Sequence, residues 1–103
     1  MRDSCLSLLG LCAKAGKTVS GQFSVEKAVK SQEAKVVIVA GDASDNTKKH
    51  FSDICSYRKI PVYVYKDGKS LGACIGKDFR MVMAVTDEGL AINLESKLRE
   101  VLN

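Results

Sequence analysis

Five consecutive apolar residues, Val36–Ala40, constrain the fold of this chain more than any other segment. A strand without a polar position has no face that water can cover, so such strands occur in sheets that carry helices on both sides. We therefore expect a central strand over residues 35–40. Because helical segments precede and follow it, the chain is predicted to form an α/β fold, a three-layer α/β/α sandwich.

Turn signals and apolar periodicity divide the rest of the chain into alternating helices and strands. The patterns predict helices over residues 3–15, 22–32 and 71–74, a helix that ends at residue 58, and a last helix after residue 87. Strands are predicted over residues 18–20, 62–65 and 79–85. The candidate caps of the helix that ends at residue 58 are Asp42, Ser44 and Asp45. The last helix should bury a stripe of Leu90, Leu94, Leu98 and Val101. Since the links are short throughout, we expect one domain over residues 1–103.

The cysteine spacing is typical of a reduced, globular protein of the cytoplasm. Cys5, Cys12, Cys55 and Cys74 form no Cys-x-x-Cys pair and no Cys/His cluster, so we expect structural thiols and no metal or other cofactor. The apolar run in the first helix is short and is interrupted by Gly10 and Lys14. We therefore expect no membrane span and no targeting segment.

The net charge of +4 is unevenly distributed along the chain. Residues 86–103 carry two basic and four acidic side chains, whereas residues 1–85 carry 14 basic and 8 acidic ones. This distribution fits a basic binding surface backed by an acidic C-terminal helix, although a basic excess can also serve solubility alone.

The segment from Ser20 to Lys30 is the best indication of function. Gly21 marks a turn into a helix that carries Lys27 and Lys30 one turn apart. The free N–H groups and the positive dipole end of a helix N-terminus bind anions, of which phosphate is the commonest in biology. An ordinary solvated helix start has the same pattern, so both interpretations remain open at this point.

Three features suggest a catalytic or nucleotide-binding site, but none has the partners that such a site needs. Residues 15–18 read Ala-Gly-Lys-Thr, but a phosphate-binding P-loop needs a glycine where Leu11 stands, and a strand before the loop. Lys14 and Lys17 remain as exposed basic residues. His50 is the only histidine and has no recognisable catalytic partner, and Asp42 is typical of a turn or cap. We therefore expect no enzyme activity.

The order of these features resembles one family. The order begins with a helix, a glycine turn, a helix with Lys27 and a strand. Three short motifs follow at the spacing that is typical of the family: Ala40-Gly41-Asp42-Ala43, Ile60-Pro61-Val62 and Leu71-Gly72-Ala73-Cys74-Ile75-Gly76. The chain is similar to the kink-turn-binding ribosomal proteins (the large-subunit "L-seven-Ae" family), particularly the small bacterial YlxQ-like members. The resemblance implies a sandwich around a small mixed four-stranded sheet, RNA binding without catalysis, and ribosomal or other structured RNA and ribosomal proteins as partners.

In that family the RNA site combines the turn before the second helix with the loop before the last strand. The family's turn reads Gly-x-Asn-Glu-x-Thr-Lys, and this chain keeps Gly21 and Lys27 but has Phe23, Ser24 and Glu26 at the three polar positions. Asn and Glu can hydrogen-bond base edges, and this chain lacks both at these positions. The resemblance therefore implies RNA binding with an altered recognition of the bases of a kink-turn. The expected RNA-binding residues are Gly21, Gln22, Phe23, Ser24, Lys27, Lys30, Ile75, Gly76, Lys77, Arg80, Lys14 and Lys17.

Phe23 has two possible environments that lead to different functions. It either stacks on an unpaired base or packs into the core. A protein-interaction module on the same fold, without direct RNA binding, is the alternative function; it would expose Phe23, Ile75 and Phe79 as an apolar patch.

Overall fold

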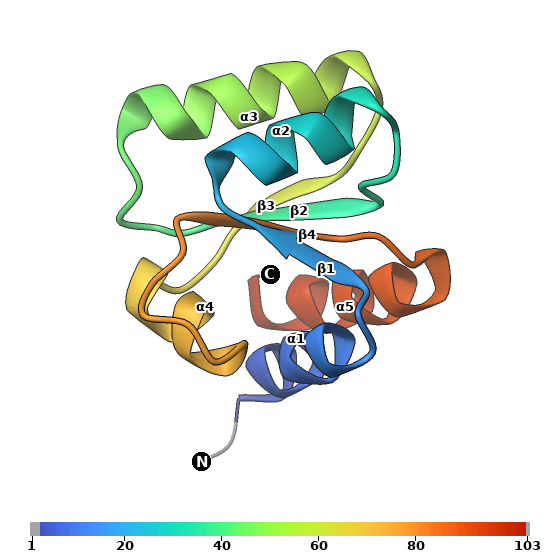
Figure 1. Cartoon of the computed structure of the whole chain (residues 1–103), viewed down its shortest axis with the longest axis vertical. Coiled ribbons are helices and arrows are strands. Elements are labelled where there is room, and N and C mark those ends of the chain that lie inside the picture. The colour runs from blue at the N-terminus through green and yellow to red at the C-terminus, as the bar shows by residue number, and fades with distance from the viewer. Residues whose placement is uncertain (1–2, 103) are drawn as a thin grey trace.

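The computed structural model describes residues 3–102 and shows an α/β/α sandwich (Figure 1). The elements in chain order are α1 (Ser4–Lys14), β1 (Thr18–Ser20), α2 (Gln22–Lys30), β2 (Val36–Val39), α3 (Asp45–Tyr57), β3 (Val62–Val64), α4 (Gly68–Cys74), β4 (Val82–Val85) and α5 (Glu88–Leu102). The strand order is β1-β4-β2-β3. Since β2 is parallel to β3, and β4 is antiparallel to both β2 and β1, the four-stranded sheet is mixed, as the resemblance implied.

Helices cover both faces of the sheet. One face packs against α2 and α3, and the other against α1, α4 and α5 (Figure 1). The strand β2 is buried along its whole length. Val36 and Ile38 belong to the core under α1 and α5, whereas Val37 and Val39 belong to the core under α2 and α3. The apolar run at residues 36–40 is thus explained by two cores that share one strand.

Polar side chains cap the starts of α3 and α4; the cap of α4 is Asp67, whose Oδ1 accepts a hydrogen bond from the Ser70 N–H at 2.7 Å. Ser44 caps α3, because its Oγ accepts a hydrogen bond from the Thr47 N–H at 3.1 Å. Asp42, the other candidate, instead accepts from the Gly68 N–H at 2.9 Å and so links the end of β2 to the start of α4. Of the candidate caps, the prediction is confirmed for Ser44 alone, since Asp45 is the first residue of the helix.

The last strand is shorter than predicted, and the last helix buries less of its predicted stripe. The strand predicted over residues 79–85 begins only at Val82, and Phe79 is 56% exposed. The reason is α4, which holds this segment away from the sheet: the Arg80 N–H donates to the Gly68 carbonyl at 2.9 Å. In α5, Leu94 and Leu98 are buried as predicted, but Val101 is 54% exposed, because the helix runs beyond the core there.

The four cysteines are free thiols, of which Cys5, Cys12 and Cys55 are buried in the two cores. Burial raises the pKa of all four, and that of Cys55 reaches about 11. The thiolate is therefore scarce at neutral pH, which fits the structural role predicted for these residues. Among the helices of residues 3–102, none is both long and apolar enough to cross a membrane.

Candidate nucleic-acid interface

The helix α2 begins at a turn that leaves its first N–H groups uncovered. Gly21 precedes the helix at φ 92° and ψ 150°, a backbone conformation that is almost restricted to glycine. Because glycine has no side chain, no side-chain cap covers the first turn. Gln22, Phe23 and Ser24, which form this turn, are exposed. The free N–H groups and the positive end of the helix dipole are suited to a phosphate.

The loop after α4, residues 75–81, forms the second half of the expected site. Gly76 has φ 77° and ends the helix: its N–H donates to the Ala73 carbonyl at 3.1 Å, and the Lys77 N–H donates to the Gly72 carbonyl at 2.8 Å. A side chain at position 76 would be strained, since L residues rarely adopt this φ. Beyond the turn, Lys77 is exposed and free to meet an anion.

Two hydrogen bonds join these halves. The Arg80 Nε–H donates to the Ser20 Oγ at 3.0 Å, and the Gly21 N–H donates to the Val82 carbonyl at 3.0 Å. The start of α2 and the loop after α4 therefore lie side by side at one end of the sheet (Figure 1). Arg80 also donates from Nη1 to the Phe79 carbonyl at 2.7 Å, so two of its donors hold the loop in place.

Lys14 lines the same groove as the first residues of the loop after α4, whereas Lys17 lies at the other end of β1. The groove has a volume of about 750 Å³ between α1 and α4, and Lys14, Ile75 and Gly76 are among its lining residues. Lys17 lies before the start of β1, at the opposite end of this strand from Gly21. The structure thus brings Lys14 to the Ile75–Gly76 side of the interface and leaves Lys17 outside it.

The outward face of α2 combines an aromatic ring with basic side chains. Phe23 is 84% exposed, so the interpretation of Phe23 as a core residue is wrong. A shallow hollow of about 520 Å³ lies on this face, lined by Phe23, Glu26, Lys27, Lys30 and Ser31. Ile75 lines the other groove, so Phe23 and Ile75 face different hollows and do not share one.

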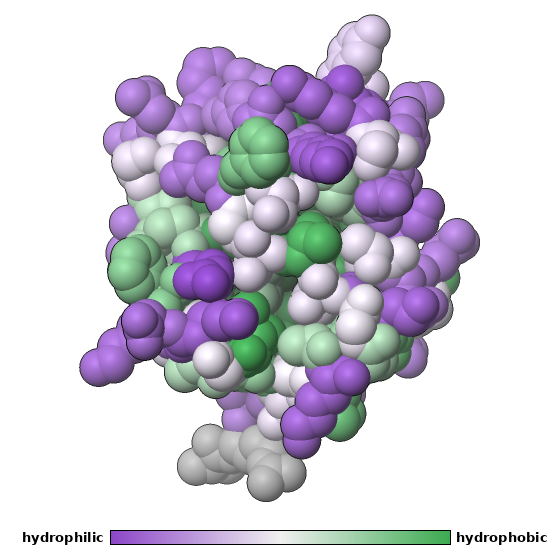
Figure 2. Space-filling model, in the orientation of Figure 1, coloured by the Kyte–Doolittle hydropathy of each residue, from purple (hydrophilic) through white to green (hydrophobic). Residues whose placement is uncertain are grey.

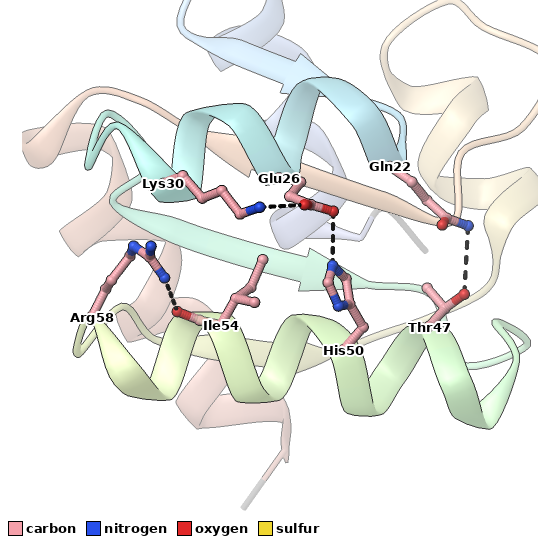
Figure 3. A network of polar contacts seen from close by, with 7 residues as sticks. All are labelled: Gln22, Glu26, Lys30, Thr47, His50, Ile54 and Arg58. Atoms are coloured by element: carbon pink, nitrogen blue, oxygen red, sulfur yellow. Dashed lines mark hydrogen bonds and ion pairs between the residues drawn. The ribbon is translucent and has the colours of Figure 1, made fainter.

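A row of polar contacts ties α2 to α3 (Figure 3). Glu26 is its centre: the carboxylate binds the Lys30 Nζ at 2.7 Å and the His50 Nε2 at 2.8 Å. The hydrogen bonds from Lys30 and His50 lower the pKa of Glu26. At the start of α2, the Gln22 Nε2 donates to the Thr47 Oγ1 at 3.4 Å.

This network changes the roles of the predicted basic residues. Lys30 has a carboxylate partner, whereas Lys27 forms no ion pair with any of the described residues. The contacts of Glu26 with His50 and of Gln22 with Thr47 could not be predicted from the sequence, because the partners lie on different helices, 24 and 25 residues apart. Within residues 3–102, no three His, Cys, Asp or Glu side chains could hold a metal ion together.

Comparison with known proteins identifies relatives over most of the chain. A family model described as "Ribosomal protein L7Ae/L30e/S12e/Gadd45 family" matches residues 3–95. The RNA-binding protein YlxQ of Bacillus subtilis is 45% identical over 91 residues, which are 88% of this chain and 91% of that protein. The large ribosomal subunit protein eL30 of Candida albicans is 34% identical over 90 residues, which are 85% of each.

A solved structure shares the architecture in detail. It is described as a protein with unknown function from Bacillus halodurans C and has a TM-score of 0.93 and 38% sequence identity. The match covers 95% of this chain and 99% of the other. With the family model and the relatives over the same residues, it follows that this chain belongs to the ribosomal protein L7Ae/L30e/S12e/Gadd45 family.

Proposed function

We propose that this protein binds structured RNA, ribosomal or of the kink-turn type, without catalysing a reaction. The observation that carries the proposal is the meeting of an uncapped helix N-terminus with a basic loop at one end of the sheet. The relatives support it, because they are an RNA-binding protein and a ribosomal subunit protein. We place its action in the cytoplasm, where the buried free thiols stay reduced.

The proposed contacts to phosphate come from backbone and lysine. Gly21 and Gly76 carry no side chain and allow the RNA backbone to approach the N–H groups closely. Lys27 is the main phosphate ligand, because it is exposed on α2 and has no acidic partner among residues 3–102. Lys77 approaches from the other half of the interface, and Arg80 fixes the distance between the halves.

Contacts to base edges are weaker than the family pattern provides. Gln22 is already hydrogen-bonded to Thr47, and Ser24 has a much shorter side chain than the glutamate it replaces. Phe23 has no polar atom, so it cannot read a base edge at all. We therefore expect most of the binding free energy to come from phosphates, and selectivity among structured RNAs to be lower than in relatives with the Asn-Glu pair.

A binding titration tests the proposal. A kink-turn RNA and an unrelated hairpin of equal length are titrated at 50 and at about 200 mM salt, a range over which phosphate contacts weaken markedly. We expect both RNAs to bind, the kink-turn more tightly, with a steep loss of affinity at the higher salt concentration. Absence of binding to either RNA at low salt would refute the proposal and favour the protein-interaction module, for which the exposed Phe23 and Phe79 are the candidate contacts.

Replacing one lysine tests the location of the site. Lys27→Ala should weaken binding of both RNAs. It should also reduce the slope of log affinity against log salt by about 1, the change expected when one phosphate contact is lost. The matched control is Lys35→Ala, because Lys35 is exposed and lies at the opposite end of the sheet, where its backbone N–H donates to the Val85 carbonyl at 2.8 Å. Equal losses in the two variants would exclude Lys27 as a specific contact.

A further inference from the structure

The outward face of α2 is a line of side chains that leads away from the turn at Gly21. With 3.6 residues per turn, positions 23, 27 and 30 lie within about 60° of arc and span about 10 Å of the helix axis. We define the α2 strip as Phe23, Lys27, Lys30 and Ser31, which with Glu26 line the hollow of about 520 Å³. In the view of Figure 2, the upper layer of the molecule, where α2 and α3 lie, is mostly hydrophilic and carries one apolar group surrounded by hydrophilic ones.

We propose that the α2 strip binds an unpaired segment of the RNA whose structured part is held at the start of α2. This inference rests on the proposed function and adds a second ligand class, single-stranded nucleotides. One base stacks on the Phe23 ring, and the neighbouring phosphates contact Lys27 and Lys30.

The exposure of Phe23 supports a role in binding rather than in folding. Its side chain projects from the first turn of α2 and is 84% exposed, so it contributes almost nothing to either core. A base that stacks on such a ring covers apolar surface, and this contact tolerates any base, because every base has a π face. The hollow beside the ring leaves room for the nucleotide.

The ion pair of Lys30 is the second argument. Lys30 binds Glu26 at 2.7 Å, but their side chains are 55% and 33% exposed, so the pair is a surface contact that exchanges readily. Glu26 keeps a partner when Lys30 turns to a phosphate, because the His50 Nε2 lies 2.8 Å from the same carboxylate (Figure 3). Lys30 can therefore move to a phosphate while the Glu26 carboxylate keeps its contact with the His50 Nε2.

The chemistry of the strip favours RNA over a protein as its occupant. The hollow is lined by two lysines, one hydroxyl and one carboxylate, Glu26, which Lys30 and His50 hold, and Phe23 is its only large apolar side chain. A protein partner would need a wider apolar surface than one ring. A ring flanked by cations, by contrast, matches the alternation of base and phosphate along a single strand.

The test compares one RNA with and without unpaired tails. The kink-turn RNA is prepared blunt, with six unpaired uridines at its 5′ end, and with the same tail at its 3′ end; hexauridine alone serves as a fourth ligand. We expect one of the tails to raise the affinity of the wild-type protein about fivefold or more, because stacking of a single base reaches this size. Phe23→Ala should abolish the gain, so that this variant binds the tailed and the blunt RNA with affinities within about twofold of each other.

Tyr57→Ala is the matched control, because Tyr57 is also 84% exposed but lies at the far end of α3. It should retain the gain from the tail. The proposal fails if neither tail raises the affinity, if Phe23→Ala retains the gain, or if Phe23→Ala weakens blunt and tailed RNA equally. Binding of hexauridine without binding of blunt RNA would refute the proposed function and keep the strip, so the two failures are distinguishable.

Discussion

Replacing Gly72 by alanine should destabilise the protein, although the same change in most helices stabilises them. Gly72 lies in α4, directly under the loop after this helix. A Cβ at this position would lie 2.7 Å from the backbone N and 2.9 Å from the backbone C of Phe79, and closer still to its Cα. Ordinary Cβ contacts begin at 3.4 Å, so the Phe79 backbone would have to move by about 0.7 Å or more.

The cost follows from what this movement disturbs. Alanine gains about 1 kcal/mol over glycine in a helix. Against this, overpacking costs about 1–3 kcal/mol, and the hydrogen bonds from Lys77 to Gly72 and from Arg80 to Gly68 are each worth about 1 kcal/mol. With both hydrogen bonds lost, the net loss in the free energy of unfolding is about 2–4 kcal/mol. For a domain of this size it corresponds to a fall in Tm of about 10–20 °C.

Thermal unfolding followed by circular dichroism measures this effect. The matched control is Gly89→Ala in α5, where the new Cβ would meet only the Asp87 carboxylate at an ordinary 3.5 Å. That variant should be as stable as the wild type or up to about 1 kcal/mol more stable. If Gly72→Ala matched Gly89→Ala in Tm, the close packing of α4 on the loop would not be what holds the loop off the sheet.

Two further predictions concern helix caps and pH. Ser44→Ala should lower the free energy of unfolding by about 1 kcal/mol, because the Thr47 N–H loses its acceptor; urea unfolding measures the loss, and an unchanged midpoint would contradict the cap. Burial acts to raise the pKa of Asp3, but hydrogen bonds from Tyr65, the Leu6 N–H and Lys66 outweigh it and hold the pKa below the ordinary 3.8. The ionised Asp3 therefore stabilises the fold at neutral pH, and this contribution is lost as the pH falls through the lowered value. Asp3→Asn should be less stable than the wild type at pH 7, and the difference should narrow as the pH falls below 3.8; a difference that did not narrow would point to packing rather than charge.

The parts of the fold that were predictable depend on local patterns with one strong physical cause. Val36–Ala40 is buried because the strand is covered on both faces, and that requirement is visible in the run itself. The start of the last strand was not predictable, because Phe79 has strand-forming character and only the packing of α4 keeps it in the loop. Tertiary contact overrides local propensity at this point.

The candidate site divides in the same way. The open turn at Gly21 and the cap at Gly76 could be predicted, because glycine at these positions reflects backbone geometry. The exposure of Phe23 could not be decided, since the spacing of apolar residues in α2 is compatible with either environment. The polar contacts between α2 and α3 escaped prediction because no local rule pairs Glu26 with His50, 24 residues away.

The position of β4 has a consequence for how the protein is made. This strand, residues 82–85, lies between β1 and β2 and pairs with both of them. The two early strands do not pair with each other, so only β4 joins them in one sheet. The turn at Gly21 is itself anchored to Val82. During synthesis the first eighty residues therefore leave the ribosome with the sheet incomplete and the turn unanchored. Assembly of the interface must await nearly the whole chain, so a nascent fragment that ends before β4 should be unable to hold RNA as the finished protein does.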